Sequence, residues 1–200
     1  MKRAFALHLK RYFWAYLLAG VFSVSIWTWV IPAKTKPKAK ERVGVFVAAK
    51  VVDQEKMKAR ILAQGDDTLL EAEIYVQYPG SLYFGPSIQS SGRRSSDFYL
   101  LPSDIGDDWI RSLCPGFSDI AWEETFPELG EPYHIGEQCY GRKVELGDYL
   151  SEEADQEKDY YLFLNRYSKN FGSFYVPPEK SAESSHGIEA IHALFGGKSS

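Results

Sequence analysis

Residues 43–78 read VGVFVAAKVVDQEKMKARILAQGDDTLLEAEIYVQY, and this stretch decides the fold. The apolar run 43–48 is typical of a buried strand. Residues 54–64 carry their apolar side chains on one helical face, and Asp53 is placed to cap that helix. Residues 71–78 then alternate apolar and polar side chains, as a strand does. Strand, helix and strand in this order predict a βαβ unit with parallel pairing and a right-handed crossover.

The segments that follow extend this unit into one domain. Apolar runs and alternating patterns predict further strands at 97–101, 138–146 and 160–164. Helical patterns cover 107–113 and 184–195, and the acidic stretch 152–159 is interpreted as a surface loop. We therefore expect an α/β domain over residues 43–197, with a mixed, largely parallel sheet flanked by helices.

The N-terminal side of the chain predicts a membrane helix. Residues 12–31 read YFWAYLLAGVFSVSIWTWVI and carry no charge. A helix of this length spans about 30 Å, the thickness of the hydrocarbon core of a bilayer. Aromatic residues gather at both ends of the segment and basic residues flank it, as at the two headgroup boundaries. We expect residues 12–31 to contact membrane lipid as a single transmembrane helix.

The same region suggests how the chain is placed in a cell. The only plausible signal-peptidase position, after Ala33, matches the cleavage pattern poorly, so we favour an uncleaved anchor. Basic residues are almost equal on the two sides of the helix, but a short basic N-terminus usually stays in the cytosol. We expect a cytoplasmic segment 1–11, a basic linker 33–42 and an extracytoplasmic domain in a single-pass protein of the cell membrane.

Charge is distributed very unevenly along the chain. Residues 1–42 contain nine basic residues and one acidic residue, a net charge of +8. Residues 43–200 contain 14 basic and 26 acidic residues, a net charge of −12. Contacts to phosphate supply most of the affinity of proteins for nucleic acid. A strongly acidic domain therefore argues against a nucleic-acid partner.

Cys114 and Cys139 are the only two cysteines. An even number in an exported domain is compatible with one disulfide, and two unpaired buried thiols are an equal alternative. A structural zinc site needs four ligands, so these two cannot form one alone.

No enzyme motif is present in the sequence. There is no G-x-S-x-G, P-loop, H-E-x-x-H or C-x-x-C pattern. His134, His186 and His192 are well separated, and we interpret them as surface histidines. We expect no catalytic activity, no cofactor and no metal site.

The segment 79–96 is the most suggestive of binding. It is rich in glycine and serine and connects two predicted strands. In open α/β sheets, ligands bind beyond the carboxyl ends of the strands. Hydroxyl groups and arginine side chains there can bind a small polar ligand, which makes candidate contacts of Ser90, Ser91, Arg93 and Arg94. The alternative is a flexible surface loop whose serines keep it soluble.

Three passages resemble the extracytoplasmic solute-binding proteins of ABC transporters. They are the opening unit VGVFVAAKVVDQEKMKARILAQ to EAEIYVQY, the strand SSDFYLLPSDI, and DYYLFLNRYSKNFG followed by a closing helix. Members of that family usually have two lobes, for which this chain is too short, and the chain resembles a reduced, one-lobed relative. The resemblance implies a non-catalytic domain that captures a small polar ligand or presents its fold to a membrane transporter.

A second function class remains open on the same sequence. A structural or protein-interaction ectodomain of a cell-envelope complex would need no small ligand. The aromatic residues of 114–140 would serve such a role if they formed an exposed patch, whereas burial in the core would explain them without it. No set of residues in the sequence indicates a hydrolase.

Overall fold

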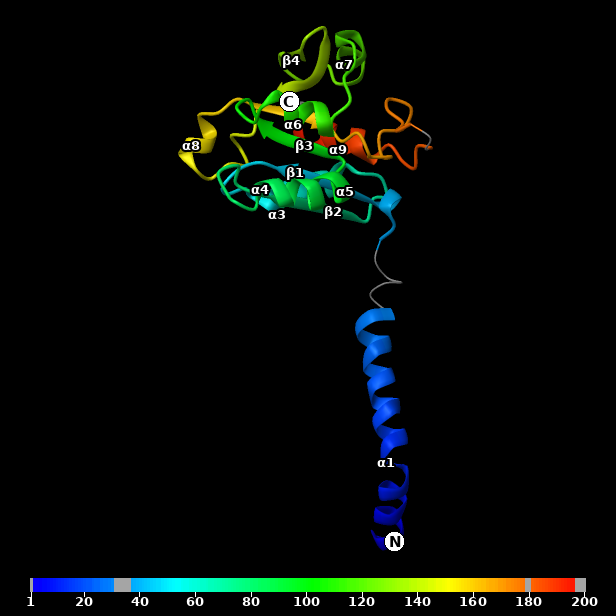
Figure 1. The fold of residues 1–200 in the computed structure, drawn as a ribbon. Helices are drawn as coiled ribbons and strands as arrows, with labels where there is room; N and C mark the ends of the chain where they lie inside the picture. Colours follow the sequence, from blue (N-terminus) through cyan, green and yellow to red (C-terminus); the bar gives the residue numbers. More distant parts are fainter. Residues whose placement is uncertain (1, 31–36, 179–180, 197–200) are drawn as a thin grey trace. The chain divides into compact units, whose positions relative to one another are not determined.

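The computed structural model of the chain describes residues 2–30, 37–178 and 181–196, which fall into two units, Met1–Pro37 and Lys38–Ser200 (Figure 1). The first unit contains helix α1, Lys2–Ser25, which continues as the π-helix η1, Ile26–Val30. A non-helical backbone at Tyr12 (φ −110°, ψ 15°) interrupts α1.

The first unit has the properties expected of a membrane span. Residues Arg11–Trp29 form 19 residues of mean hydropathy 1.2, long and apolar enough to cross a bilayer. A signal sequence near an N-terminus has the same properties. Of the expected segments, Ile31, residues 33–36 and the position after Ala33 lie outside the described residues. Within the second unit, residues 39–41 of the expected linker form the 3-10 helix η2, Ala39–Glu41, and Arg42 starts the first strand.

A six-stranded mixed sheet is the centre of the second unit, with the order β2-β1-β3-β6-β5-β4. The strands are β1 Arg42–Val47, β2 Glu71–Val76, β3 Phe98–Pro102, β4 Pro132–Ile135, β5 Gln138–Val144 and β6 Tyr160–Leu164. The predicted βαβ unit is confirmed, because β1 pairs in parallel with β2 and β3.

The expectation of a largely parallel sheet is wrong. In the described part of the chain, three of the five strand pairings are antiparallel: β3 with β6, β6 with β5, and β5 with β4. For β4 and β5 the physical reason lies in the connection between them. Only Gly136 and Glu137 separate these strands, and a two-residue turn can join antiparallel strands but not parallel ones. Gly136 adopts the positive φ (69°) that such a turn requires at its first position.

Helices cover both faces of the sheet. Helix α3, Gln54–Gln64, and helix α9, His186–Phe195, pack against each other and on one face, together with α7, Asp119–Thr125. The other face carries α4 Phe84–Ser87, η3 Ile88–Gly92, α5 Arg93–Ser95 and α6 Asp107–Leu113. A short helix α8, Glu153–Gln156, lies between β5 and β6 in the sequence. Successive strand residues point to opposite faces, so Val45 joins the first core and Phe46 the second.

The segment 79–96 is not the loop that its composition predicts. It forms a nearly continuous helical stretch from Phe84 to Ser95. Phe84 and Ile88 lie four residues apart and are both buried against the second face of the sheet. Burial of this pair outweighs the low helix propensity of the glycines and serines around it.

The aromatic residues of 114–140 belong to the core. Trp122 and Phe126 are buried, and Phe117 stacks on Phe174 with ring centroids 5.0 Å apart. Tyr133 and Tyr140 are partly buried against the opposite face. The exposed aromatic patch considered from the sequence is therefore not formed by these residues.

The two cysteines are free thiols on opposite faces of the sheet. Cys114 belongs to the core under α6, whereas Cys139 of β5 belongs to the core under α3 and α9. The layer of strands separates them, and a disulfide requires Cα atoms within about 7 Å. Of the two alternatives, the structure has the pair of unpaired buried thiols.

Neither thiol is expected to react with a disulfide reagent in the native protein at neutral pH. Burial raises the pKa of Cys139 to about 11 and raises the pKa of Cys114 further, and the thiolate is the reactive form. Unfolding without reductant should then release two reactive thiols, counted with a chromogenic disulfide reagent. A count near zero in the unfolded, unreduced chain would contradict the arrangement.

Candidate functional site

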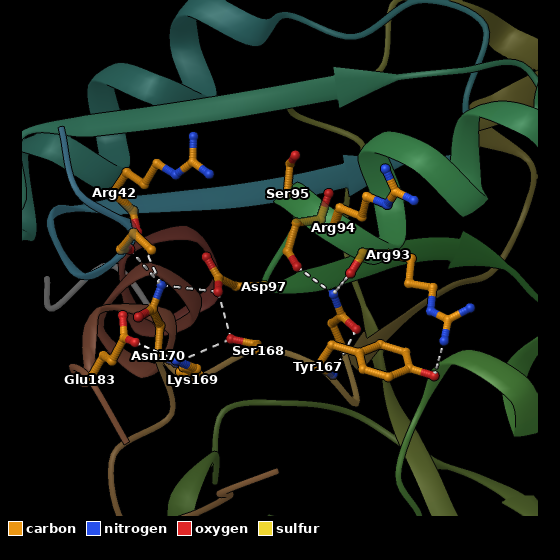
Figure 2. Close-up of a pocket in the computed structure, with 13 residues that line it drawn as sticks. Arg42, Arg93, Arg94, Ser95, Asp97, Tyr167, Ser168, Lys169, Asn170 and Glu183 are labelled. Carbon is orange, nitrogen blue, oxygen red and sulfur yellow. Dashed lines mark hydrogen bonds and ion pairs between the residues drawn. The ribbon is translucent and has the colours of Figure 1, made fainter. Parts of the chain in front are cut away.

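A polar cavity of about 370 Å³ opens at one edge of the sheet (Figure 2). It lies at the amino ends of β1 and β3 and at the carboxyl end of β6, and not at the carboxyl edge where the sequence suggested a ligand would bind. Four segments meet there, and the lining includes Ala39, Arg42, Arg93, Arg94, Ser95, Ser96, Asp97, Asn165, Tyr167, Ser168, Lys169, Asn170 and Glu183.

Two of the four candidate contacts line this cavity. Arg93 and Arg94 stand at the end of the helical stretch, next to the start of β3. Ser90 and Ser91 are not part of the lining. The Ser90 hydroxyl donates to the Pro86 carbonyl oxygen at 2.9 Å, within its own helical segment. The Ser90 side chain therefore stabilises the segment that carries the arginines.

The two arginines differ in how they are held. The Arg93 guanidinium lies 4.3 Å from the centroid of the Tyr167 ring and donates to the Tyr167 hydroxyl at 2.6 Å (Figure 2). This cation–π contact and hydrogen bond fix its position. Arg94 is exposed, and its side chain makes no hydrogen bond or ion pair with any described residue. It is available to an incoming group.

The floor of the cavity is built around the buried carboxylate of Asp97. Its Oδ1 accepts from the Ser168 hydroxyl at 2.5 Å and from the Asn170 amide at 3.0 Å. Its Oδ2 accepts from the Gly44 backbone N–H at 2.9 Å. Asn170 also donates to the Arg42 carbonyl oxygen at 3.1 Å. Asp97 thus joins the starts of β1 and β3 to the segment after β6.

Gly44 permits this close approach. A Cβ atom at position 44 would collide with the Ser95 carbonyl oxygen and would lie 2.8 Å from the Ser96 Cα. Glycine allows the backbone before β3 to rest directly on β1, where the Asp97 N–H donates to the Gly44 carbonyl oxygen at 2.6 Å.

Asn165 fixes the end of the helical stretch that bears the arginines. Its amide nitrogen lies within hydrogen-bond distance of three carbonyl oxygens, those of Gly92, Arg93 and Ser96, at 3.3, 3.1 and 2.6 Å. Carbonyl groups at a helix end have no partner within the helix. Asn165 supplies one and so holds the backbone of Arg93 in place.

The cavity carries more positive than negative charge on its surface. Of its cations, Arg42 pairs with Glu73 at 3.4 Å and Lys169 with Glu183 at 2.5 Å. Arg93 and Arg94 have no carboxylate partner among the described residues. In a domain with a net charge of −12, this makes the cavity locally attractive to an anion.

The free energy of unfolding is expected to depend on pH through the protonation of Asp97. Burial raises the pKa of this carboxyl above its usual value, although the hydrogen bonds from Ser168 and the Gly44 N–H oppose the shift. Between the pKa of the unfolded chain and the higher pKa of the folded protein, the folded state binds more protons. The free energy of unfolding therefore falls as pH rises through this window and then levels off.

Chemical unfolding across a pH series from about 4 to 7 would measure this dependence. The reference is Asp97→Asn, whose side chain does not titrate and thus removes the contributions of all other groups from the difference. A difference between the two proteins that is flat, or that rises with pH, would contradict the assignment.

His186 is not at the surface, contrary to the prediction. It is only 3% exposed, and its Nε2 lies 2.9 Å from the Thr68 hydroxyl and 3.1 Å from an Asp66 carboxylate oxygen. The Thr68 hydroxyl also lies 2.6 Å from the same Asp66 oxygen. Neither Thr68 nor His186 lines the cavity. These contacts join α9 to the turn before β2.

Sequence reasoning missed Asp97, Asn165, Ser168 and Asn170. A signal was present in the polar run NRYSKN, residues 165–170, which directly follows the buried strand β6. Polar side chains that continue straight from a core strand lie at the sheet edge, where a site can form.

No protein-family model, no curated protein and no solved structure matches this chain.

Proposed function

We propose that this chain is a membrane-anchored, non-catalytic binding domain that captures a small anionic or polar solute in the cavity at the amino edge of its sheet. One observation carries the proposal: Arg94 is exposed on the lining with no partner among the described residues, beside an Arg93 that Tyr167 holds in place. A guanidinium group that is free to bind, next to a second one that is held in place, is suited to a carboxylate or a phosphate.

The size and polarity of the cavity narrow the ligand class. About 370 Å³ is at the lower end of the range for small-molecule sites. The lining is largely charged and polar, so a compact, polar solute bearing a carboxylate or phosphate fits better than an apolar one. Lys169 also lines the cavity, but its ammonium group is paired with Glu183.

The resemblance to extracytoplasmic solute-binding proteins supports the same function. In this proposal Arg11–Trp29 anchors the chain in the cell membrane, the acidic domain lies on the extracytoplasmic side, and a membrane transporter or another envelope protein receives the ligand. Protease added to intact cells is then expected to remove the domain, and protection of the domain would reverse the orientation.

Thermal unfolding of the full chain in detergent, with a panel of amino acids, sugar phosphates, peptides and inorganic oxyanions, tests the binding. A ligand at about 100 times its Kd stabilises by about 2.7 kcal/mol, which raises the Tm by roughly 5–10 °C. Arg94→Ala should abolish the rise. Arg111→Ala, which changes an exposed arginine of α6, should leave it intact. Absence of a rise with every compound would contradict solute capture.

A second candidate, a protein-interaction domain, is favoured by a different surface. The segment after β2 exposes Leu82 (96%), Tyr83 (72%) and Tyr78 (46%). Exposed apolar residues that gather in one segment are typical of contact sites. A photo-crosslinking residue at position 82 should capture a specific membrane or envelope partner, whereas one at the exposed Asp67 should not. Equal labelling at both positions would argue against this surface.

A further inference from the structure

Three potential metal ligands converge outside the cavity, at the hairpin formed by β4 and β5. Asp119, His134 and Cys139 place one ligand atom each within 4.8 Å of the others. The His134 Nε2 lies 3.0 and 3.1 Å from the two Asp119 carboxylate oxygens. The carboxylate and the imidazole are nearly half exposed, whereas Cys139 is buried beneath them.

Backbone hydrogen bonds hold the segments that carry His134 and Asp119 next to Cys139. His134 is its cross-strand partner in the hairpin closed by Gly136. On the other side, the backbone of Cys139 exchanges two hydrogen bonds with Phe117, at 2.9 and 3.1 Å. Asp119 follows Phe117 by two residues and starts α7. The ligands therefore come from rigid, mutually bonded segments, as a pre-organised site requires.

A neighbouring arginine holds the backbone of the Asp119 ligand in place. Arg142 of β5 donates to the Asp119 carbonyl oxygen at 3.2 Å and to a Glu123 carboxylate oxygen, also at 3.2 Å. These bonds fix the first turn of α7 against β5. Residues that hold metal ligands in orientation are a regular part of metal sites.

We propose that Asp119, His134 and Cys139 bind one Zn²⁺ ion. A thiolate, an imidazole and a carboxylate are the ligand types that zinc accepts, at bond lengths of about 2.0–2.3 Å. Ligand atoms around such an ion lie about 3–4 Å apart, and the His134–Asp119 distances already match this. On binding, the Cys139 thiol releases its proton to solvent.

Three protein ligands leave a fourth position of the tetrahedral ion open. The open position would lie on the solvent side, since Asp119 and His134 are the exposed members of the site and Cys139 is its buried base. Water, or a ligand atom of another molecule, would occupy it. The site is independent of the cavity and of the function proposed for it.

Cobalt titration of the full chain in detergent, after treatment with a chelator, tests the proposal. Co²⁺ reports a thiolate ligand through a charge-transfer absorption band, and excess Zn²⁺ should remove that band. Cys139→Ser is expected to abolish it, and His134→Ala to weaken binding by more than about 100-fold, beyond the usual effect of an orienting residue. Cys114→Ser is the matched control and should keep the band, because Cys114 lies on the opposite face of the sheet.

A thiolate band of bound Co²⁺ is specific to the cluster of Asp119, His134 and Cys139. A second group of possible ligands, Asp66, His186 and Glu189, contains no sulfur and cannot give a thiolate band. Thermal unfolding of metal-free Cys139→Ser and His134→Ala distinguishes lost binding from lost folding. A folded wild-type chain without the band at saturating cobalt, or a band that survives in Cys139→Ser, would overturn the proposal.

Discussion

Replacing Asp97 with alanine is expected to lower the free energy of unfolding by at least about 3 kcal/mol, because three buried donors each lose an acceptor at a cost of about 1–3 kcal/mol. The donors are the Ser168 hydroxyl, the Asn170 amide and the Gly44 N–H. They come from β1 and from the segment after β6, so the loss should also loosen the floor of the cavity. A change of this size approaches the whole stability of many domains.

Chemical unfolding monitored by tryptophan fluorescence would measure the loss. Asp67→Ala is the matched control, since Asp67 is an exposed aspartate in the turn before β2. We expect the control to change the free energy of unfolding by less than about 0.5 kcal/mol. Equal effects of the two substitutions would show that the network around Asp97 does not stabilise the fold.

Trp122→Ala is expected to cost about 3–5 kcal/mol, the usual range for removing a large aromatic side chain from a core. The indole is fully buried, with ring centroids 5.5 Å from Phe126 and 5.9 Å from both Phe117 and Phe174. Alanine would leave a cavity in the middle of this aromatic group, and the surrounding rings cannot collapse fully into it.

Two comparisons isolate the packing effect. Trp122→Phe keeps an aromatic ring and removes an indole N–H that is buried without a partner among the described residues, so it should cost less than about 1.5 kcal/mol. Ile120→Ala changes an exposed residue of the same helix and should be nearly neutral. A loss in Trp122→Ala no larger than in Ile120→Ala would refute the role of Trp122 in the core.

Local patterns were sufficient for much of the fold. The helix predicted at 107–113 and the strand predicted at 160–164 have those bounds in the structure, and the unit of β1, α3 and β2 is also confirmed. The strand 160–164 is a continuous apolar run, and α3 has one apolar face between a capping aspartate and a glycine. Such signals depend on neighbours in the sequence.

The sequence contains only a weak signal for the antiparallel half of the sheet. The turn at Gly136 and Glu137 lacks the Asn-Gly or Asp-Gly pair that marks most tight hairpins. Without that mark, the sequence predicts no strand at β4, and the direction of the strands after it does not follow. Phe84 and Ile88 were overlooked for a similar reason, because glycines and serines surround them.

The candidate site was predictable only where it follows from residue type. Arg93 and Arg94 were chosen because guanidinium groups bind anions, and both line the cavity. Asp97 was assigned no role because its partners are remote: Gly44 lies 53 residues away, Ser168 71 and Asn170 73. Contacts at that separation depend on the topology of the sheet. The convergence of Asp119, His134 and Cys139 was missed for the same reason.

The place where the chain enters the second unit has a mechanical consequence. Its first strand, β1, lies inside the sheet, with hydrogen-bonded neighbours on both sides. Asn170 further ties the carbonyl oxygens of Ala39 and Arg42 to the Asp97 carboxylate. A force that pulls on residue 38 must therefore break the hydrogen bonds of β1 to both neighbouring strands and those of Asn170 at the same time. The hydrogen bonds of an edge strand could instead break one after another. The start of the second unit is therefore its mechanically resistant end.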